Sequence, residues 1–205
     1  TRPDSFPILT LPKNFRHLLR PTNDVYVELD YNSAEMRTAI ALSGQQQPDV
    51  DIHNFLKSEL YNDKLERDKV KQKVFAWLYN PKAKNKKLDS YIDKESLLNN
   101  YHSSGMITTP FDRTISVDED KALNYLVQST TSDMFLNQAI KIHDLLKNTS
   151  SHIAFCIHDS LILDMSRSDK PLLQEIVSVF RETDLGAFKV NLSMGKNFGA
   201  LRKVL

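Results

Sequence analysis

The sequence predicts an α+β fold, with a small antiparallel sheet and helices on one side of it. Four short apolar runs have the length of strands, at residues 25–30, 153–157, 161–164 and 190–194. Helical patterns fill the long stretch between the first run and the second. The second and third runs are separated only by His158-Asp159-Ser160, which reads as a hairpin turn and makes these two strands antiparallel.

The strand at residues 25–30 is expected to lead directly into a helix. Apolar and polar residues alternate along this run, as in a strand with one buried face. Asn32 or Ser33 then serves as the helix cap, and the helix stops at Gly44, where a left-handed residue ends helices readily. A second helix is expected over residues 51–60.

The helix expected over residues 64–80 has the clearest pattern. Val70, Val74 and Leu78 place one apolar stripe along it, and Pro81 ends it. A capping box at Ser116–Glu119 predicts the start of a long helix that continues to Asn148, with a bend at its polar residues 129–132. The other expected segments are a weak helix at 88–103, an extended stretch at 108–116 and an amphipathic helix at 171–183.

Composition excludes a membrane-spanning chain and a disordered one. The 205 residues are 40% hydrophobic and 26% charged, enough for an ordinary core, and no apolar run reaches the length of a membrane span. Cys156 is the single cysteine, which fits a reducing compartment, and its apolar neighbours predict a small core residue. We therefore expect a cytoplasmic protein.

Charge is balanced overall, at +1, but not locally. Residues 65–87 hold eight Lys/Arg against two acids. Such a concentration attracts phosphates, although a solvated lysine face is the alternative.

Two aspartates, Asp30 and Asp159, each end an apolar run. An ionised carboxylate at the end of a buried strand is costly unless it is paired. Two such groups at one sheet edge would hold divalent metal ions, as in two-metal phosphoryl transfer. Taken singly, each has an ordinary alternative, a helix-entry residue for Asp30 and a turn residue for Asp159.

A stripe of four residues, Arg67, Lys71, Phe75 and Tyr79, runs along the helix at 64–80 with a spacing of four. Residues at this spacing lie on one slowly winding face. Two cations followed by two aromatics suit a triphosphate and a stacked base. The alternative is an exposed cationic turn followed by a core aromatic pair.

Together and in this order, these motifs resemble the signatures of family A DNA polymerases, the DNA polymerase I-like group, in its phage-like branch. Asp30-Tyr-x-x-x-Glu35-x-Arg37, with Asp51-Ile-His53 downstream, resembles the first signature, and the Arg67 to Tyr79 stripe resembles the fingers helix. Asn124-x3-Gln128 with Asp133 is similar to the next helix, and His158-Asp159 to the last signature.

The resemblance implies a palm and short fingers without a thumb. Residues 1–63 would form the first part of the palm, 64–123 the reduced fingers, and 124–205 the second part of the palm. The implied activity is template-directed DNA synthesis from dNTPs. Asp30 and Asp159 would bind two Mg²⁺ ions, with the backbone carbonyl of Tyr31 completing a metal shell.

The resemblance also implies roles in substrate binding. Glu35 would close the pocket over the sugar and exclude a 2′-hydroxyl. His53, Arg67 and Lys71 would hold phosphate oxygens, Phe75 would pack on the incoming nucleotide, and Tyr79 would stack where the template base waits. The residues implied in binding primer-template DNA are Arg113, Asn124, Gln128 and His158, with a loose match at Arg2.

The chain also departs from the family pattern. Ala76 and Asn80 stand where the family often has glycines, and Ser160 stands where it often has an acid. A thumb and an exonuclease would have to come from a missing N-terminal segment or another chain. The alternatives left open are a DNA-binding fragment that is inactive without such a partner, a two-metal nuclease, and a plain α+β domain. The location would be the cytoplasm, including that of an infected host cell.

Overall fold

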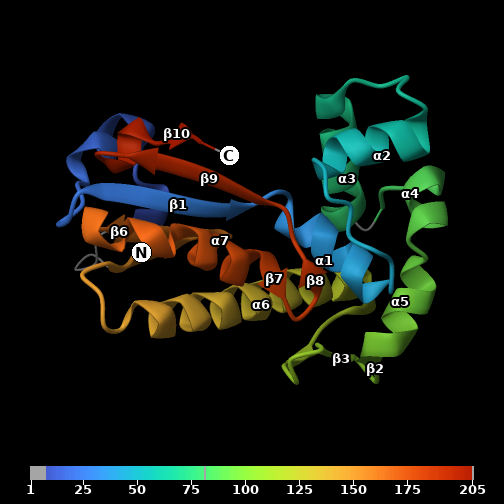
Figure 1. Cartoon of the computed structure of the whole chain (residues 1–205). Helices are drawn as coiled ribbons and strands as arrows, with labels where there is room; N and C mark the ends of the chain where they lie inside the picture. The colour runs from blue at the N-terminus through green and yellow to red at the C-terminus, as the bar shows by residue number, and fades with distance from the viewer. Residues whose placement is uncertain (1–7, 81, 205) are drawn as a thin grey trace. The chain divides into compact units, whose positions relative to one another are not determined.

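The computed structural model describes residues 8–80 and 82–204 and divides into two compact units (Figure 1). The sheet unit comprises the chain up to Tyr31, Leu136–Glu182 and the chain from Val190 onward. The helical unit comprises Asn32–Phe135 and Thr183–Lys189. No described helix is long and apolar enough to cross a membrane.

The sheet unit is built on a five-stranded antiparallel sheet in the order β10-β9-β1-β6-β5. The central strand β1 pairs with β6 on one side and with β9 on the other. The four predicted strands are confirmed, and β10 is an addition. The strands are β1 (Val25–Tyr31), β5 (His152–Ile157), β6 (Ser160–Met165), β9 (Val190–Gly195) and β10 (Arg202–Lys203).

The two faces of β1 are covered differently, because successive side chains point to opposite faces. On one face the Tyr31 ring stacks on Phe180 of α7, with centroids 4.2 Å apart. On the other face Tyr26 and Phe198 belong to a small apolar cluster. The helical segments of this unit are η1 (Ile8–Thr10), η2 (Lys13–Leu18), η4 (Arg167–Leu172), α7 (Leu173–Arg181), η5 (Phe198–Ala200) and the C-terminal part of α6 (Ala122–Leu146).

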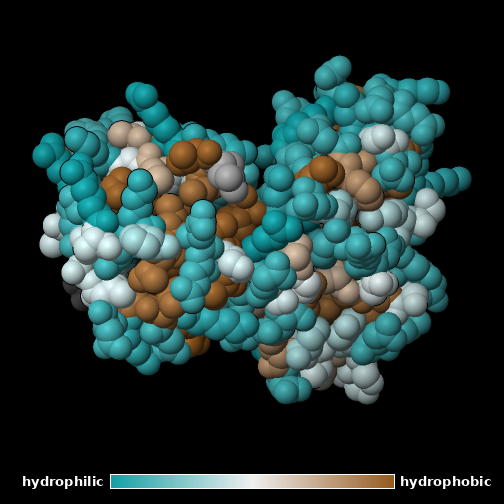
Figure 2. Space-filling model, viewed as in Figure 1, coloured by the Kyte–Doolittle hydropathy of each residue, from teal (hydrophilic) through white to brown (hydrophobic). Residues whose placement is uncertain are grey.

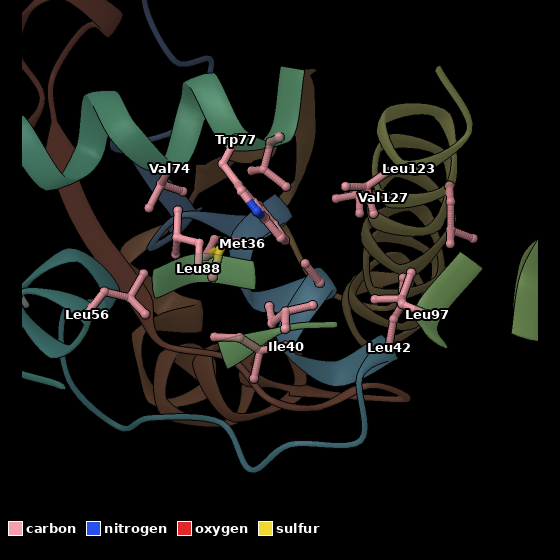
Figure 3. Close-up of a cluster of buried hydrophobic side chains, with 14 of the residues drawn as sticks. Met36, Ile40, Leu42, Leu56, Val74, Trp77, Leu88, Leu97, Leu123 and Val127 are labelled. Atoms are coloured by element: carbon pink, nitrogen blue, oxygen red, sulfur yellow. The ribbon is translucent and has the colours of Figure 1, made fainter. Parts of the chain in front are cut away.

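The helical unit packs its helices around a buried apolar cluster. Met36, Ile40, Leu56 and Leu123 converge there with Trp77, which extends from α3 into the cluster (Figure 3). Its helices are α1 (Ala34–Leu42), α2 (Ile52–Tyr61), α3 (Arg67–Tyr79), α4 (Lys86–Tyr91), α5 (Lys94–Tyr101), η3 (Glu119–Lys121) and the N-terminal part of α6. Its first small sheet is β2 (His102–Ser103), β3 (Met106–Thr108) and β4 (Thr114–Ser116), and a short hairpin pairs β7 (Glu182–Thr183) with β8 (Gly186–Ala187).

Several local expectations are wrong. The capping box does not form, because Ser116 pairs with Met106 in the β3–β4 ladder and η3 precedes α6. α6 runs as one helix through residues 129–132, where Thr131 Oγ1 donates to the carbonyl of Val127 at 2.7 Å, and the bend expected there stays a prediction. Two helices, α4 and α5, replace the single weak helix, and a hairpin replaces the extended stretch at 108–116.

Two expectations about single residues also fail. Ser33 stands at the N-cap of α1 but has a left-handed backbone with φ of 57° and makes no side-chain capping bond. Cys156 is exposed rather than part of the core, because β5 is the edge strand of the sheet. Pro81 lies outside the described residues, and α3 ends before it, at Tyr79.

Candidate functional site

The sheet unit places Asp30 and Asp159 at the same edge of its sheet, the one at which β1 ends and the β5–β6 turn lies. Asp30 is directly opposite Ser160 of β6 and Asn191 of β9. Since Ile157 pairs with Ser160, the β5–β6 turn consists of His158 and Asp159, and His158 has a φ of 54°. The hairpin therefore brings the second aspartate beside the first across a long separation in sequence.

The Asp30 carboxylate is held by two side chains. The Ser160 hydroxyl donates to Oδ1 at 2.9 Å, and the Asn191 amide donates to Oδ2 at 3.2 Å. Lys203 Nζ in turn donates to Asn191 Oδ1 at 3.0 Å. No sequence motif marks Asn191, because only the register between β1 and β9 brings it to Asp30.

Negative charge accumulates at this edge. Burial, and then the charge of Asp30, raise the pKa of Asp159. Glu28, two residues before Asp30 on the same face, also has a raised pKa, first through burial and then through Asp30, while a Ser193 hydrogen bond and Arg16 oppose the rise. Neighbouring carboxylates that resist ionisation are stabilised by a bound cation.

The donors at this edge fit a hard divalent cation, although within the described residues no three His, Cys, Asp or Glu side chains form a ready-made metal cluster. Carboxylate and carbonyl oxygens are the ligands that Mg²⁺ prefers. The Tyr31 side chain is turned away, since its hydroxyl donates to the carbonyl of Phe180 at 2.6 Å and its ring stacks on Phe180. Only its backbone carbonyl remains as a ligand from this residue.

The helical unit carries the basic and aromatic stripe on the outer face of α3. Val70, Val74, Trp77 and Leu78 are buried on the other face. Phe75 and Tyr79 are 43% and 37% exposed, and their rings stack with centroids 5.7 Å apart. The Lys71 ammonium lies 5.6 Å from the Phe75 ring centroid. The alternative of a core aromatic pair is therefore wrong.

Arg67, the first residue of the stripe, forms a bidentate ion pair with Asp51. Its Nε and one terminal nitrogen donate to the two carboxylate oxygens at 3.0 and 2.7 Å. Asp51 also caps α2, accepting from the Asn54 amide at 2.9 Å. The pair holds the pKa of Asp51 well below its usual range, against the effect of burial.

His53 lies inside the helical unit, only 2% exposed. Its Nε2 is 2.8 Å from the Ser33 hydroxyl, and its Nδ1 is buried with no hydrogen-bond partner in the part of the chain that the structure describes. Burial lowers its pKa to about 4, and Asp51 opposes this while Arg67, Lys71 and Arg37 add to it. His53 is therefore neutral at pH 7, and its role as a phosphate ligand stays a prediction.

Glu35 lies half-buried in the first turn of α1, and Arg37, two residues further on, is completely buried. Arg37 donates to three backbone carbonyls, those of Asn32 at 2.8 Å, Pro48 at 2.7 Å and Val50 at 2.6 Å. Its role is to hold the loop between α1 and α2.

The expected DNA-binding residues differ in their surroundings. Arg113 is half-exposed and pairs with Asp133, with Nε 3.0 Å from Oδ2. On α6 Gln128 is exposed, while Asn124 is half-buried and lines a cavity of about 550 Å³ inside the helical unit together with Tyr79 and Tyr125. His158 is exposed at the hairpin turn. Arg2 lies outside the described residues.

No family model matches the chain, but a curated protein and a solved structure are both similar to it. The chain is 24% identical over 198 residues to a DNA polymerase of Mycobacterium phage D29, a match that covers 78% of this chain and 32% of the phage protein. Its structure resembles the POL domain of Pol1 from M. smegmatis, solved in complex with DNA primer-template and dNTP. The TM-score is 0.71 at 18% identity, with 92% of this chain and 43% of that chain covered.

These matches confirm the resemblance to family A DNA polymerases that the motifs predict, and the α+β fold that goes with it. The chain spans about a third of the phage relative and less than half of the solved chain. The predicted division at residues 63 and 123 and the individual site roles stay predictions.

Proposed function

We propose that the chain is the palm-and-fingers portion of a DNA-directed DNA polymerase, which extends a primer 3′-hydroxyl with dNTPs along a DNA template. The convergence of Asp30 and Asp159 at one sheet edge carries this proposal, because two-metal nucleotidyl transfer requires paired carboxylates. The phage relative is named a DNA polymerase, and the similar structure was solved with primer-template and dNTP.

In this proposal Asp30, Asp159 and the Tyr31 carbonyl hold two Mg²⁺ ions. Bound there, the ions would lower the pKa of the attacking hydroxyl and stabilise the leaving pyrophosphate. Ser160 and Asn191 keep the Asp30 carboxylate oriented through their hydrogen bonds. Both are positioning residues, and Ser160 stands in the place of the acid that the family often has after the hairpin aspartate.

The helical unit would bind the incoming nucleotide. Arg67 and Lys71 supply positive charge for phosphate oxygens, and His53 would add a neutral donor. Phe75 and Tyr79 present exposed ring faces for the sugar, base and template, and Glu35 would reject the 2′-hydroxyl. Primer-template contacts are proposed for Arg113, Asn124, Gln128 and His158.

The exposed basic and aromatic stripe argues against a two-metal nuclease, which needs no grip on a nucleoside triphosphate. The grip on duplex DNA is proposed to come from a thumb on an N-terminal segment or a separate chain. The phage relative supports the cytoplasm of an infected cell as the place of action.

The test is primer extension by this chain on a short primer-template with Mg²⁺ and dNTPs. Asp30→Asn and Asp159→Asn should each abolish extension. Asp112→Asn is the matched control, because Asp112 also lies in a hairpin turn, with φ of 60°, but in the helical unit. Primer-template binding without extension by the wild type would favour an inactive DNA-binding fragment. Degradation of DNA without dNTPs would restore the nuclease.

A further inference from the structure

The Asp51 side chain is held firmly at the N-terminus of α2. Its carboxylate accepts four hydrogen bonds, two of them from Arg67. The other two come from the Asn54 amide and from Asn32 Nδ2, both at 2.9 Å. A carboxylate saturated in this way is well fixed.

The two partners of the Asp51–Arg67 ion pair differ in how firmly they are held and in how exposed they are to solvent. Asn32 is anchored on the Asp51 side, since its Oδ1 accepts from the Ile52 amide at 2.9 Å and Arg37 donates to its carbonyl. Arg67 lies in the first turn of α3, and its side chain is 40% exposed. The guanidinium is therefore the partner that a ligand from solvent reaches.

The surroundings of this pair are cationic. Three cationic side chains lie close enough to His53 that the charge of each lowers its pKa: Arg37, Arg67 and Lys71. Asp51 offsets part of this charge, and Asp68, an exposed residue, lies 3.6 Å from Arg67. A guanidinium donates two parallel hydrogen bonds to a carboxylate or to a phosphate with the same geometry, so one anion can replace the other.

We propose that Asp51 is an internal counter-anion, which occupies the Arg67 guanidinium until the phosphates of a nucleoside triphosphate displace it. Asp51 thereby sets the affinity of the chain for triphosphate. This inference rests on the proposed function, in which Arg67 binds phosphate. Asp51 acts through Arg67 and is a positioning residue.

The test is the binding of dATP, and separately of inorganic tripolyphosphate, to the full chain, measured by calorimetry. Asp51→Asn removes the charge but keeps an excellent helix cap for α2. It should bind dATP about fivefold more tightly than the wild type, the factor imposed by a competing ion pair of roughly 1 kcal/mol. Structural damage would not strengthen binding.

Two controls sharpen the result. Asp93→Asn makes the same change at the N-cap of α5, where Asp93 accepts from Glu95 and Ser96 amides, and should leave the affinity unchanged. Combining Asp51→Asn with Arg67→Gln should abolish the gain, because the effect passes through Arg67.

The outcomes separate the inference from the proposed function. Unchanged or weaker binding by Asp51→Asn, with binding by the wild type, overturns the inference alone. A gain that persists without Arg67 also overturns it. Failure of the wild type and of every variant to bind either ligand overturns the inference and the nucleotide-binding part of the proposed function together.

Discussion

Replacing the buried Arg37 should destabilise the helical unit strongly. Its side chain is completely buried and donates to the carbonyls of Asn32, Pro48 and Val50. Arg37→Met keeps much of the volume but removes all three donors, which leaves three carbonyls without these partners. At about 1 kcal/mol or more for each hydrogen bond from a charged donor, the loss in unfolding free energy should be roughly 3–5 kcal/mol.

Trp77 provides the assay, because it is the only tryptophan of the chain and lies buried in the same unit. Urea unfolding followed by its fluorescence gives the unfolding free energy of wild type and variants. Lys73→Ala, an exposed cation on α3, should change this value by less than about 0.5 kcal/mol. A loss below about 1 kcal/mol in Arg37→Met would refute the reasoning, since the three hydrogen bonds would then contribute little net stability.

Four further outcomes follow from the site. Asp159→Asn should raise the melting temperature of the metal-free chain by about 2–4 °C, since it removes a half-buried charge beside Asp30. A lower melting temperature than the wild type, measured in the presence of EDTA, would contradict this. Lowering the pH from about 6.5 towards 4 should reduce the unfolding free energy of the helical unit by up to roughly 3 kcal/mol. Over this range His53 binds a proton in the unfolded chain but stays neutral in the native one, where its pKa is about 4. His53→Gln should flatten this dependence in urea unfolding at several pH values. Phe75→Tyr should raise the incorporation of dideoxynucleotides relative to deoxynucleotides in competition assays. Equal use of the two kinds of nucleotide by the wild type would contradict this. Cys156 should react with iodoacetamide in the folded chain at a rate still rising at pH 9, because partial desolvation raises the pKa of its thiol; a plateau at lower pH would count against this.

Local periodicity was sufficient to predict the strands and the stripe on α3. The alternation in residues 25–30 and the spacing of four from Arg67 to Tyr79 each reflect the repeat of one element. The same is true of the turn at His158 and Asp159, which sits between two apolar runs. The α+β fold and the edge position of both aspartates follow from these patterns.

Features that depend on tertiary partners were beyond the sequence. Arginine is rarely fully buried, so the pattern around Arg37 gave no sign of its carbonyl partners. Asn191 acquires its contact with Asp30 only through the register of β9. The local capping signal at Ser116 was outweighed by strand pairing with Met106, and Cys156 is exposed because its strand lies at the sheet edge.

The central position of β1 has a consequence for how the chain acquires its structure. Both neighbours of β1 lie far along the chain, since Asp30 pairs with Ser160 and with Asn191. Loop closure over such separations is slow, and an unpaired apolar strand is prone to aggregate while it waits. During synthesis β1 must therefore leave the ribosome long before its partners exist. The helical unit has its own core and is complete in sequence except for Thr183–Lys189, so it is the part expected to fold first.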